Sequence, residues 1–254
     1  MRLVAMQWRH LLLLTCSAVI LGCVRCDFRN TGDCHSKHPP KYDSPEYCHE
    51  PQQPHLGCNN NNQWGAKCKD NAQMVNISTG MATTIVRLMN TYRNIVARGT
   101  FHNLPAAGRM NKLAWDESLA DLAQLAAKRC VMDPIRKSFT TTLASKPGYT
   151  AILNKYPSDQ KQDVLKIVKS QLKTWYDQYI YVDAASLLSG TTRAGHEISH
   201  FLQLITGMNS RVGCAISIFK EESWNVQLMI CLYGCSKPKN SFTYAIASKR
   251  TAAF

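Results

Sequence analysis

Near its C-terminus the sequence reads Ser199-His200-Phe201-Leu202-Gln203-Leu204, then Val212-Gly213-Cys214-Ala215, then Ile230-Cys231-Leu232-Tyr233-Gly234. A short helix is expected around His196 to Leu204. Runs of apolar and β-branched residues follow it, and such runs are typical of strands. The predicted strands are Val212–Phe219, Val226–Leu232 and Phe242–Ala247.

Three longer helices are predicted upstream of these strands. Apolar residues recur there at steps of three and four, over residues 79–99, 116–130 and 163–181. Asp116 is a suitable N-cap for the second helix, because a carboxylate can accept hydrogen bonds from the free backbone N–H groups. Helices that come first and strands that come late, with little alternation, predict a layered α+β fold.

The N-terminus has the pattern of a secretory signal peptide. Arg2 and Arg9 form a basic region, and the apolar run Leu11–Val24 is too short to span a bilayer comfortably. We expect cleavage between Gly22 and Asp27, which removes a signal peptide of residues 1–26. The protein is then expected to be secreted to the extracellular space, without a transmembrane segment.

The rest of the chain divides into two predicted parts. Residues 27–78 form a cysteine-bearing N-terminal extension, and residues 79–254 form the main domain. The motif Asn76-Ile77-Ser78 makes Asn76 a candidate N-glycosylation site. The net charge is +13 for the full chain and about +10 once the three arginines of the signal peptide are lost. Basic charge favours anionic partners, and a secreted protein is not expected to meet nucleic acid.

Eight of the eleven cysteines lie beyond Asp27. An even number of cysteines in a secreted chain predicts four disulfides. Eight cysteines permit 105 pairings, so the count leaves the connectivity open. The eight are Cys34, Cys48, Cys58, Cys68, Cys130, Cys214, Cys231 and Cys235.

Further motifs precede the C-terminal series: Tyr47-Cys48, His55-Leu56-Gly57-Cys58, Cys68, Asn90-Thr91-Tyr92-Arg93, Ala97-Arg98-Gly99, Leu104-Pro105-Ala106-Ala107, Met110–Trp115 and Leu119–Cys130. Together with that series they resemble the CAP superfamily, which comprises cysteine-rich secretory proteins, antigen 5 and pathogenesis-related 1 proteins. The match is similar to the insect antigen 5 branch and covers roughly residues 47–234.

The resemblance implies a three-layer α-β-α sandwich with a disulfide-stapled N-terminal extension. It also implies the disulfides Cys48–Cys58, Cys68–Cys130 and Cys214–Cys231. Cys34 and Cys235 are then left over as a candidate fourth pair. An alternative joins Cys34 to Cys58 and Cys48 to Cys235.

CAP domains often have a cleft with two histidines and two acids, which in some members binds a divalent metal. Of these four residues, the resemblance places only His200 in this chain. The other positions correspond to Pro134, Gln178 and the turn Gly148-Tyr149-Thr150. A zinc site needs three or four ligands, so His200 and Gln178 mark a degenerate cleft in which we expect neither metal nor catalytic residues.

The segment His196-Glu197-Ile198-Ser199-His200 also fits the zinc-protease motif H-E-x-x-H. On a helix, His196 and His200 would share one face and could bind zinc, while the glutamate would activate water. The residues after His200 lack the glycine and histidine of the metzincin continuation. Glu221 and Glu222 fall between predicted strands, where a third ligand on a helix is not available.

These observations predict a secreted, non-catalytic binding or signalling factor that requires no cofactor. The expected setting is a reproductive secretion such as seminal fluid, or saliva or venom. The expected partner is an extracellular protein, a glycan or a lipid surface; a basic stripe on the third helix comprises Lys166, Lys169 and Lys173. Two alternatives stay open: a zinc metalloprotease, and a lipid- or sterol-binding protein that would need an apolar groove.

Overall fold

The structure is a computed structural model. It describes residue 48 and residues 55–69, 71–101, 103–132, 147–192, 194–238 and 240–247. The expected signal peptide lies outside these residues, as do Cys34 and Pro134. The predicted N-terminal extension lies only partly within them, so its bounds stay a prediction. Within the described part of the chain, no helix has the length and apolar character needed to cross a membrane.

Three long strands form the centre of the main sheet. Strands β5 (Arg211–Glu221) and β6 (Trp224–Tyr233) make an antiparallel hairpin, with Cys214 opposite Cys231. Strand β4 (Gly148–Pro157) pairs antiparallel with β6 along its full length. Strand β4 was not predicted, and its first three residues correspond to the turn of the family cleft.

Short strands complete the sheet and form a second one. At the free edge of β5, β1 (Gln73–Met74) pairs antiparallel and β3 (Ala114–Trp115) pairs parallel. A separate two-stranded sheet joins β2 (Ala107–Arg109) to β7 (Ala245–Ile246). The strand predicted over 242–247 is therefore reduced to two residues outside the main sheet.

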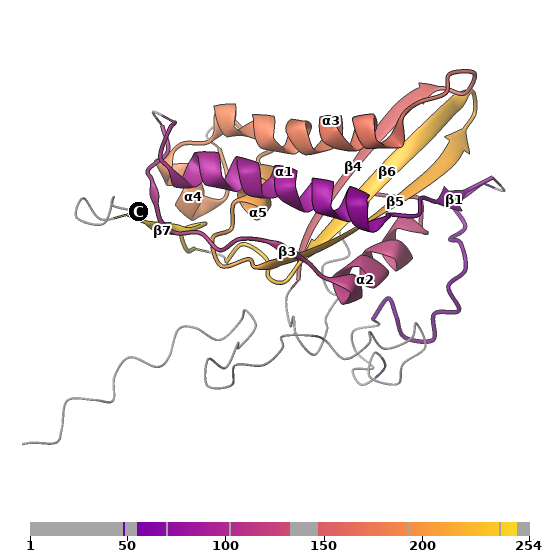
Figure 1. Cartoon of the computed structure of the whole chain (residues 1–254), viewed down its shortest axis with the longest axis horizontal. Coiled ribbons are helices and arrows are strands. Elements are labelled where there is room, and N and C mark those ends of the chain that lie inside the picture. Colours follow the sequence, from indigo (N-terminus) through magenta and orange to yellow (C-terminus); the bar gives the residue numbers. More distant parts are fainter. Residues whose placement is uncertain are drawn as a thin grey trace, which may run out of the picture.

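Helices cover both faces of the main sheet (Figure 1). Helices α1 (Thr79–Ala97) and α3 (Val164–Asp177) lie side by side on one face, and α2 (Glu117–Ala127) covers the other. The short helices η2 (Gln178–Tyr181), α4 (Ala184–Ser189) and α5 (Ser199–Leu204) lie on the α1 and α3 side, where α4 and α5 share the core beneath α1 and α3, and η2 contacts α3 and α5. The predicted three-layer α-β-α sandwich is confirmed.

Strand β6 shows why three layers form. Its buried side chains alternate with the period of two that a strand imposes. Met229 and Cys231 belong to the core beneath α1 and α3, whereas Leu228, Ile230 and Leu232 belong to the core beneath α2. Because both faces of the strand are apolar, each face must be covered by helices.

Local side-chain contacts set where two of the predicted helices begin. The carboxylate of Asp116 accepts a hydrogen bond from the Leu119 N–H, and that of Asp163 accepts from the Leu165 N–H. Asp116 is therefore the N-cap that the sequence predicts, and Asp163, the first residue of the third predicted helix, is an N-cap as well. The short helix expected from His196 is shorter than predicted, because α5 begins at Ser199.

Three disulfides are present among the described residues, and one of them, Cys68–Cys130, connects the N-terminal segment to the sandwich. The structure contains Cys48–Cys58, Cys68–Cys130 and Cys214–Cys231, which are the three bonds that the family resemblance implies. The alternative that joins Cys48 to Cys235 is thus wrong. Cys235 is also disulfide-bonded, and its partner lies outside the described residues, so a Cys34–Cys235 bond stays a prediction.

Candidate functional site

His200 and Gln178, the two residues predicted to mark the degenerate cleft, lie in contact. Gln178 begins η2, and its side-chain Nε2 lies 3.1 Å from Nδ1 of His200 in α5. Its Oε1 accepts a hydrogen bond from the Phe201 N–H at 2.9 Å. This second bond fixes the orientation of the amide, so Nε2 donates and Nδ1 of His200 accepts. The only lone pair of the neutral imidazole is therefore occupied.

The surroundings of His200 favour its neutral form. The ring is half-buried and lies parallel to Trp175, with 5.8 Å between the ring centroids. Burial lowers the pKa of His200 below its ordinary value, although the charge of Glu197 and a backbone hydrogen bond with Ala151 oppose this. A neutral ring whose acceptor nitrogen is already hydrogen-bonded has no free lone pair for a metal.

His196 lies outside the helix that carries His200. It is exposed and stacks on Tyr181 with 4.0 Å between ring centroids. Glu197 accepts a hydrogen bond at 2.6 Å from the N–H of Ser199, the first residue of α5, so its carboxylate is engaged beside that helix. The H-E-x-x-H segment therefore does not present both histidines on one helical face. Among the described residues, no group of three histidine, cysteine or acidic side chains is arranged to hold a metal.

Of the two other cleft positions, Pro134 lies outside the described residues, and the segment Gly148-Tyr149-Thr150 belongs to a strand. Gly148 begins β4 rather than forming a turn, and a Cβ atom there would lie within 2.6 Å of three side-chain atoms of Gln203. Gln203 in turn donates to the Cys235 carbonyl and accepts from the Lys237 N–H. Gln203 therefore packs directly against the backbone at Gly148, and the residues Gly148, Tyr149 and Thr150 include no acid.

A second candidate site, which the sequence analysis missed, is a groove along α1. It has a volume of about 840 Å³ and lies between α1 and the segment 110–117; we call it the α1 groove. The lining side chains on α1 recur at steps of three and four from Thr79 to Ala97. This stripe is visible in the sequence, but the opposite wall belongs to a segment without a clear helical or strand pattern.

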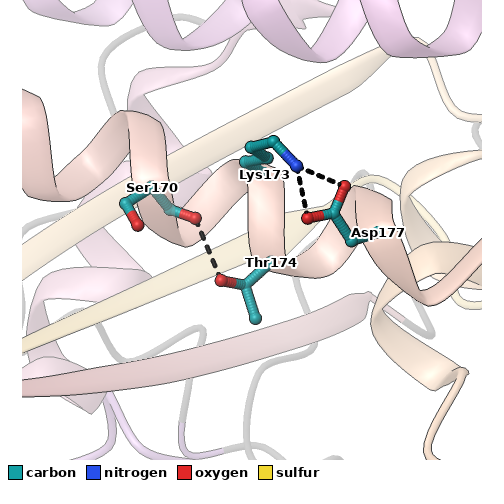
Figure 2. Close-up of polar contacts among 4 residues, drawn as sticks. All are labelled: Ser170, Lys173, Thr174 and Asp177. Carbon is teal, nitrogen blue, oxygen red and sulfur yellow. Dashed lines mark hydrogen bonds and ion pairs between the residues drawn. The ribbon is translucent and has the colours of Figure 1, made fainter.

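The predicted basic stripe on α3 is partly neutralised. Figure 2 shows Lys173 turned toward Asp177, and its Nζ lies 2.7 Å and 2.5 Å from the two carboxylate oxygens. On the same helix, the hydroxyl of Thr174 donates a hydrogen bond to the carbonyl of Ser170, one turn earlier. Because exposed ion pairs contribute little stability and remove net charge, α3 offers a weaker anion-binding surface than the three lysines suggest.

The candidate glycosylation site lies at the start of α1. Asn76 is exposed between β1 and α1. Ser78, the third residue of the motif, is the N-cap of α1, and its hydroxyl accepts a hydrogen bond from the Met81 N–H at 3.3 Å. The exposure of Asn76 is compatible with a glycan, and glycosylation itself stays a prediction.

Comparison with known sequences points to one family. A sequence model of the family described as "CAP: Cysteine-rich secretory protein family" matches residues 86–233. The chain is 29% identical over 171 residues to "Venom allergen-1" of Aedes albopictus, covering 65% of this chain and 64% of that protein. It is 26% identical over 181 residues to "Salivary antigen-5" of Dipetalogaster maximus, covering 66% and 68%.

A scorpion protein and two solved structures extend this similarity. The chain is 32% identical over 197 residues to "Venom allergen 5" of Tityus serrulatus, covering 71% of this chain but 42% of that protein. The chain thus matches less than two thirds of the length of the mosquito and scorpion relatives. The solved structures of Na-ASP-1 and BmVAL-1 each have a TM-score of 0.54 at 20% identity. The matches cover 73% and 67% of this chain, and 45% and 84% of the matched chains. At 20% identity, this likeness concerns the fold alone.

Proposed function

Because the chain belongs to the CAP family of cysteine-rich secretory proteins, in its insect antigen 5-like branch, we propose that it is a secreted, non-catalytic protein that binds an extracellular partner. The observation that carries the non-catalytic part is the hydrogen bond between Gln178 and His200. A general base or a metal ligand needs a free lone pair, and this contact uses the one that neutral His200 has.

The zinc-protease alternative lacks the geometry that its mechanism requires. Zinc binding by H-E-x-x-H depends on two histidines one helical turn apart, with the glutamate free to activate water. Here His196 stacks on Tyr181 outside the helix, and Glu197 is engaged by the Ser199 N–H. The proposal therefore assigns this segment to the start of α5 and not to catalysis.

Delivery in saliva or venom is the setting that the relatives support best. The mosquito, scorpion and bug relatives carry venom or salivary names. The disulfides of this chain are of the kind that persist in oxidising extracellular compartments. A seminal-fluid role is the competing setting, and antibody staining of salivary or venom glands against male accessory glands distinguishes the two.

The test of the non-catalytic proposal uses the full chain, secreted from insect cells and purified from the medium. We expect substoichiometric zinc by elemental mass spectrometry and no chelator-sensitive peptidase activity. The variants His196→Ala and His200→Ala are expected to behave like the wild-type chain in both assays. About one zinc per chain, lost in His196→Ala together with peptidase activity, would contradict the proposal and support the protease.

A further inference from the structure

The two walls of the α1 groove, helix α1 and segment 110–117, run side by side in opposite directions. The Asn90 carboxamide hydrogen-bonds both the N–H and the carbonyl of Leu113, and the Arg93 guanidinium donates to the Asn111 carbonyl. These contacts hold segment 110–117 along α1. The lining stripe from Thr79 to Ala97 spans about 27 Å at 1.5 Å per helical residue.

The length of the groove suits an extended chain. At about 3.3 Å per residue, a stripe of about 27 Å accommodates about eight residues of extended peptide.

Polar groups along the wall favour a peptide over an acyl chain. Thr79, Thr83 and Asn94 bring two hydroxyls and a carboxamide to the lining of the groove, and Thr83 and Asn94 are exposed. Such groups can hydrogen-bond the N–H and C=O groups of an extended backbone. An acyl chain offers them no partner and would have to desolvate them at a cost in free energy.

The charge of the groove favours an acidic ligand. Arg87 on α1 and Lys112 on the opposite wall line the groove, and neither forms an ion pair within the described part of the chain. The buried guanidinium of Arg93 also lines it and donates to backbone carbonyls. Against these three cations stands one acid, Glu117. The local potential is therefore positive, in agreement with the net charge of +13.

An apolar section lies near the start of α1. Ile77, Val86 and Trp115 line it as half-buried side chains, and Ala82 lies at its base. A partly covered indole beside small aliphatic groups is the kind of pocket in which an apolar anchor side chain contributes most of the binding energy. The groove thus combines an apolar section with a basic one.

We propose that the α1 groove binds an extended, acidic peptide segment of a partner protein. An acidic side chain lies between Arg87 and Lys112, and an apolar side chain packs against Trp115. This proposal rests on the binding role proposed above and assigns that role to one surface. The groove lies between α1 and the segment 110–117, whereas His200 contacts Gln178 of η2 and Trp175 of α3.

The test selects random octapeptides displayed on phage with the purified full chain, then measures the affinity of an enriched, fluorescein-labelled peptide by anisotropy. We expect enriched peptides to contain an acidic and a large apolar residue. The variants Arg87→Glu and Lys112→Glu should each weaken binding at least tenfold. Lys166→Glu makes the same charge change on the exposed face of α3 and should leave the affinity unchanged. Circular dichroism checks that all three variants are folded.

Three results would overturn the peptide proposal. The first is the absence of any enriched peptide, and the second is equal peptide affinity of the Lys112→Glu and Lys166→Glu variants. The third is that palmitate displaces the peptide and still binds the Lys112→Glu variant. The last result would assign the groove to an acyl chain. None of them bears on zinc content or peptidase activity, so failure of the groove proposal is distinguishable from failure of the proposed non-catalytic function.

Discussion

The side-chain amide of Gln178 donates a hydrogen bond to Nδ1 of His200 across 3.1 Å, while its oxygen accepts from the Phe201 N–H. An amide in this place holds the imidazole neutral and in a single tautomer. A carboxylate there would instead accept a hydrogen bond from a protonated Nδ1, and its charge would stabilise the imidazolium. The difference between one nitrogen and one oxygen atom at residue 178 therefore sets the charge of the cleft.

The variant Gln178→Glu tests this relationship. We expect the pKa of His200 to rise by about one or more, because the new carboxylate and the backbone contact with Ala151 both favour the protonated ring. The measurement is an NMR titration of the imidazole nitrogens. Asn94→Asp makes the same chemical change in the α1 groove and should leave the titration of His200 as it is in the wild-type chain. An unchanged pKa in Gln178→Glu would mean that the two side chains are not in contact.

The lowered pKa of His200 also predicts a pH dependence of stability. The unfolded chain binds a proton near the ordinary value of 6.5, whereas the folded chain binds it only at lower pH. Between these two values the unfolded state holds more protons, so the free energy of unfolding falls as the pH falls. Urea unfolding at a series of pH values from 7.5 downward should show a smaller loss for His200→Gln than for the wild-type chain. An equal fall in the free energy of unfolding for the two proteins would show that His200 is not the source of this pH dependence.

Short-range patterns predicted much of this fold, and contacts between distant segments explain what they missed. Asp116 and Asp163 begin helices because each carboxylate reaches N–H groups two or three residues ahead. By contrast, β4 mixes polar and apolar residues and is defined by its ten-residue pairing with β6. The start of α5 was misplaced because the backbone is not yet helical at its N-cap Ile198, which has a φ of −132° and a ψ of 0°.

The candidate sites show the same division. The family resemblance identified His200 and Gln178 as neighbours, because a motif and a fixed offset from Trp175 are both readable in sequence. The α1 groove was not predicted, since its second wall is held in place by Asn90 and Arg93. A search for a stripe of small and polar residues on α1 could have indicated one wall, and no pattern in residues 110–117 indicates the other.

Arg93 is a strong candidate for a residue that the fold requires. Its guanidinium is buried, with 2% of its surface exposed, and donates to the carbonyls of Leu204 at the end of α5 and of Asn111 and Asn209. Burial lowers the pKa of Arg93 to about 10. The positive charge also lies favourably at the C-terminal end of a helix.

Replacement by Arg93→Met should lower the free energy of unfolding by about 3 kcal/mol, because several buried carbonyls lose their donor and each such group costs about 1–3 kcal/mol. Arg93→Lys keeps the charge with fewer donors and should lose less. Arg87→Met, on the exposed side of the same helix, should change stability by about 0.5 kcal/mol or less. Urea unfolding followed by circular dichroism measures all three. Similar stabilities for the Arg93 and Arg87 variants would contradict the role of Arg93.

Gly213 allows α2 to lie directly on β5. A Cβ atom at this position would be 2.1 Å from the Ala120 nitrogen and 2.5 Å from the Asp116 carbonyl oxygen. Both are backbone atoms, so no change of rotamer can relieve the contact. The variant Gly213→Ala must therefore push α2 away from the sheet, and we expect a loss of at least about 2–3 kcal/mol in thermal or urea unfolding.

Gly80→Ala is the matched control for this substitution. Gly80 lies in the first turn of α1, and the nearest atom to a Cβ there is the Ser78 Oγ at 3.9 Å. The added methyl group makes only an ordinary van der Waals contact and removes the helix-destabilising effect of glycine, so stability should be unchanged or rise by up to about 1 kcal/mol. A Gly213→Ala variant that is secreted and melts like Gly80→Ala would show that α2 does not approach β5 at the distance of this structure.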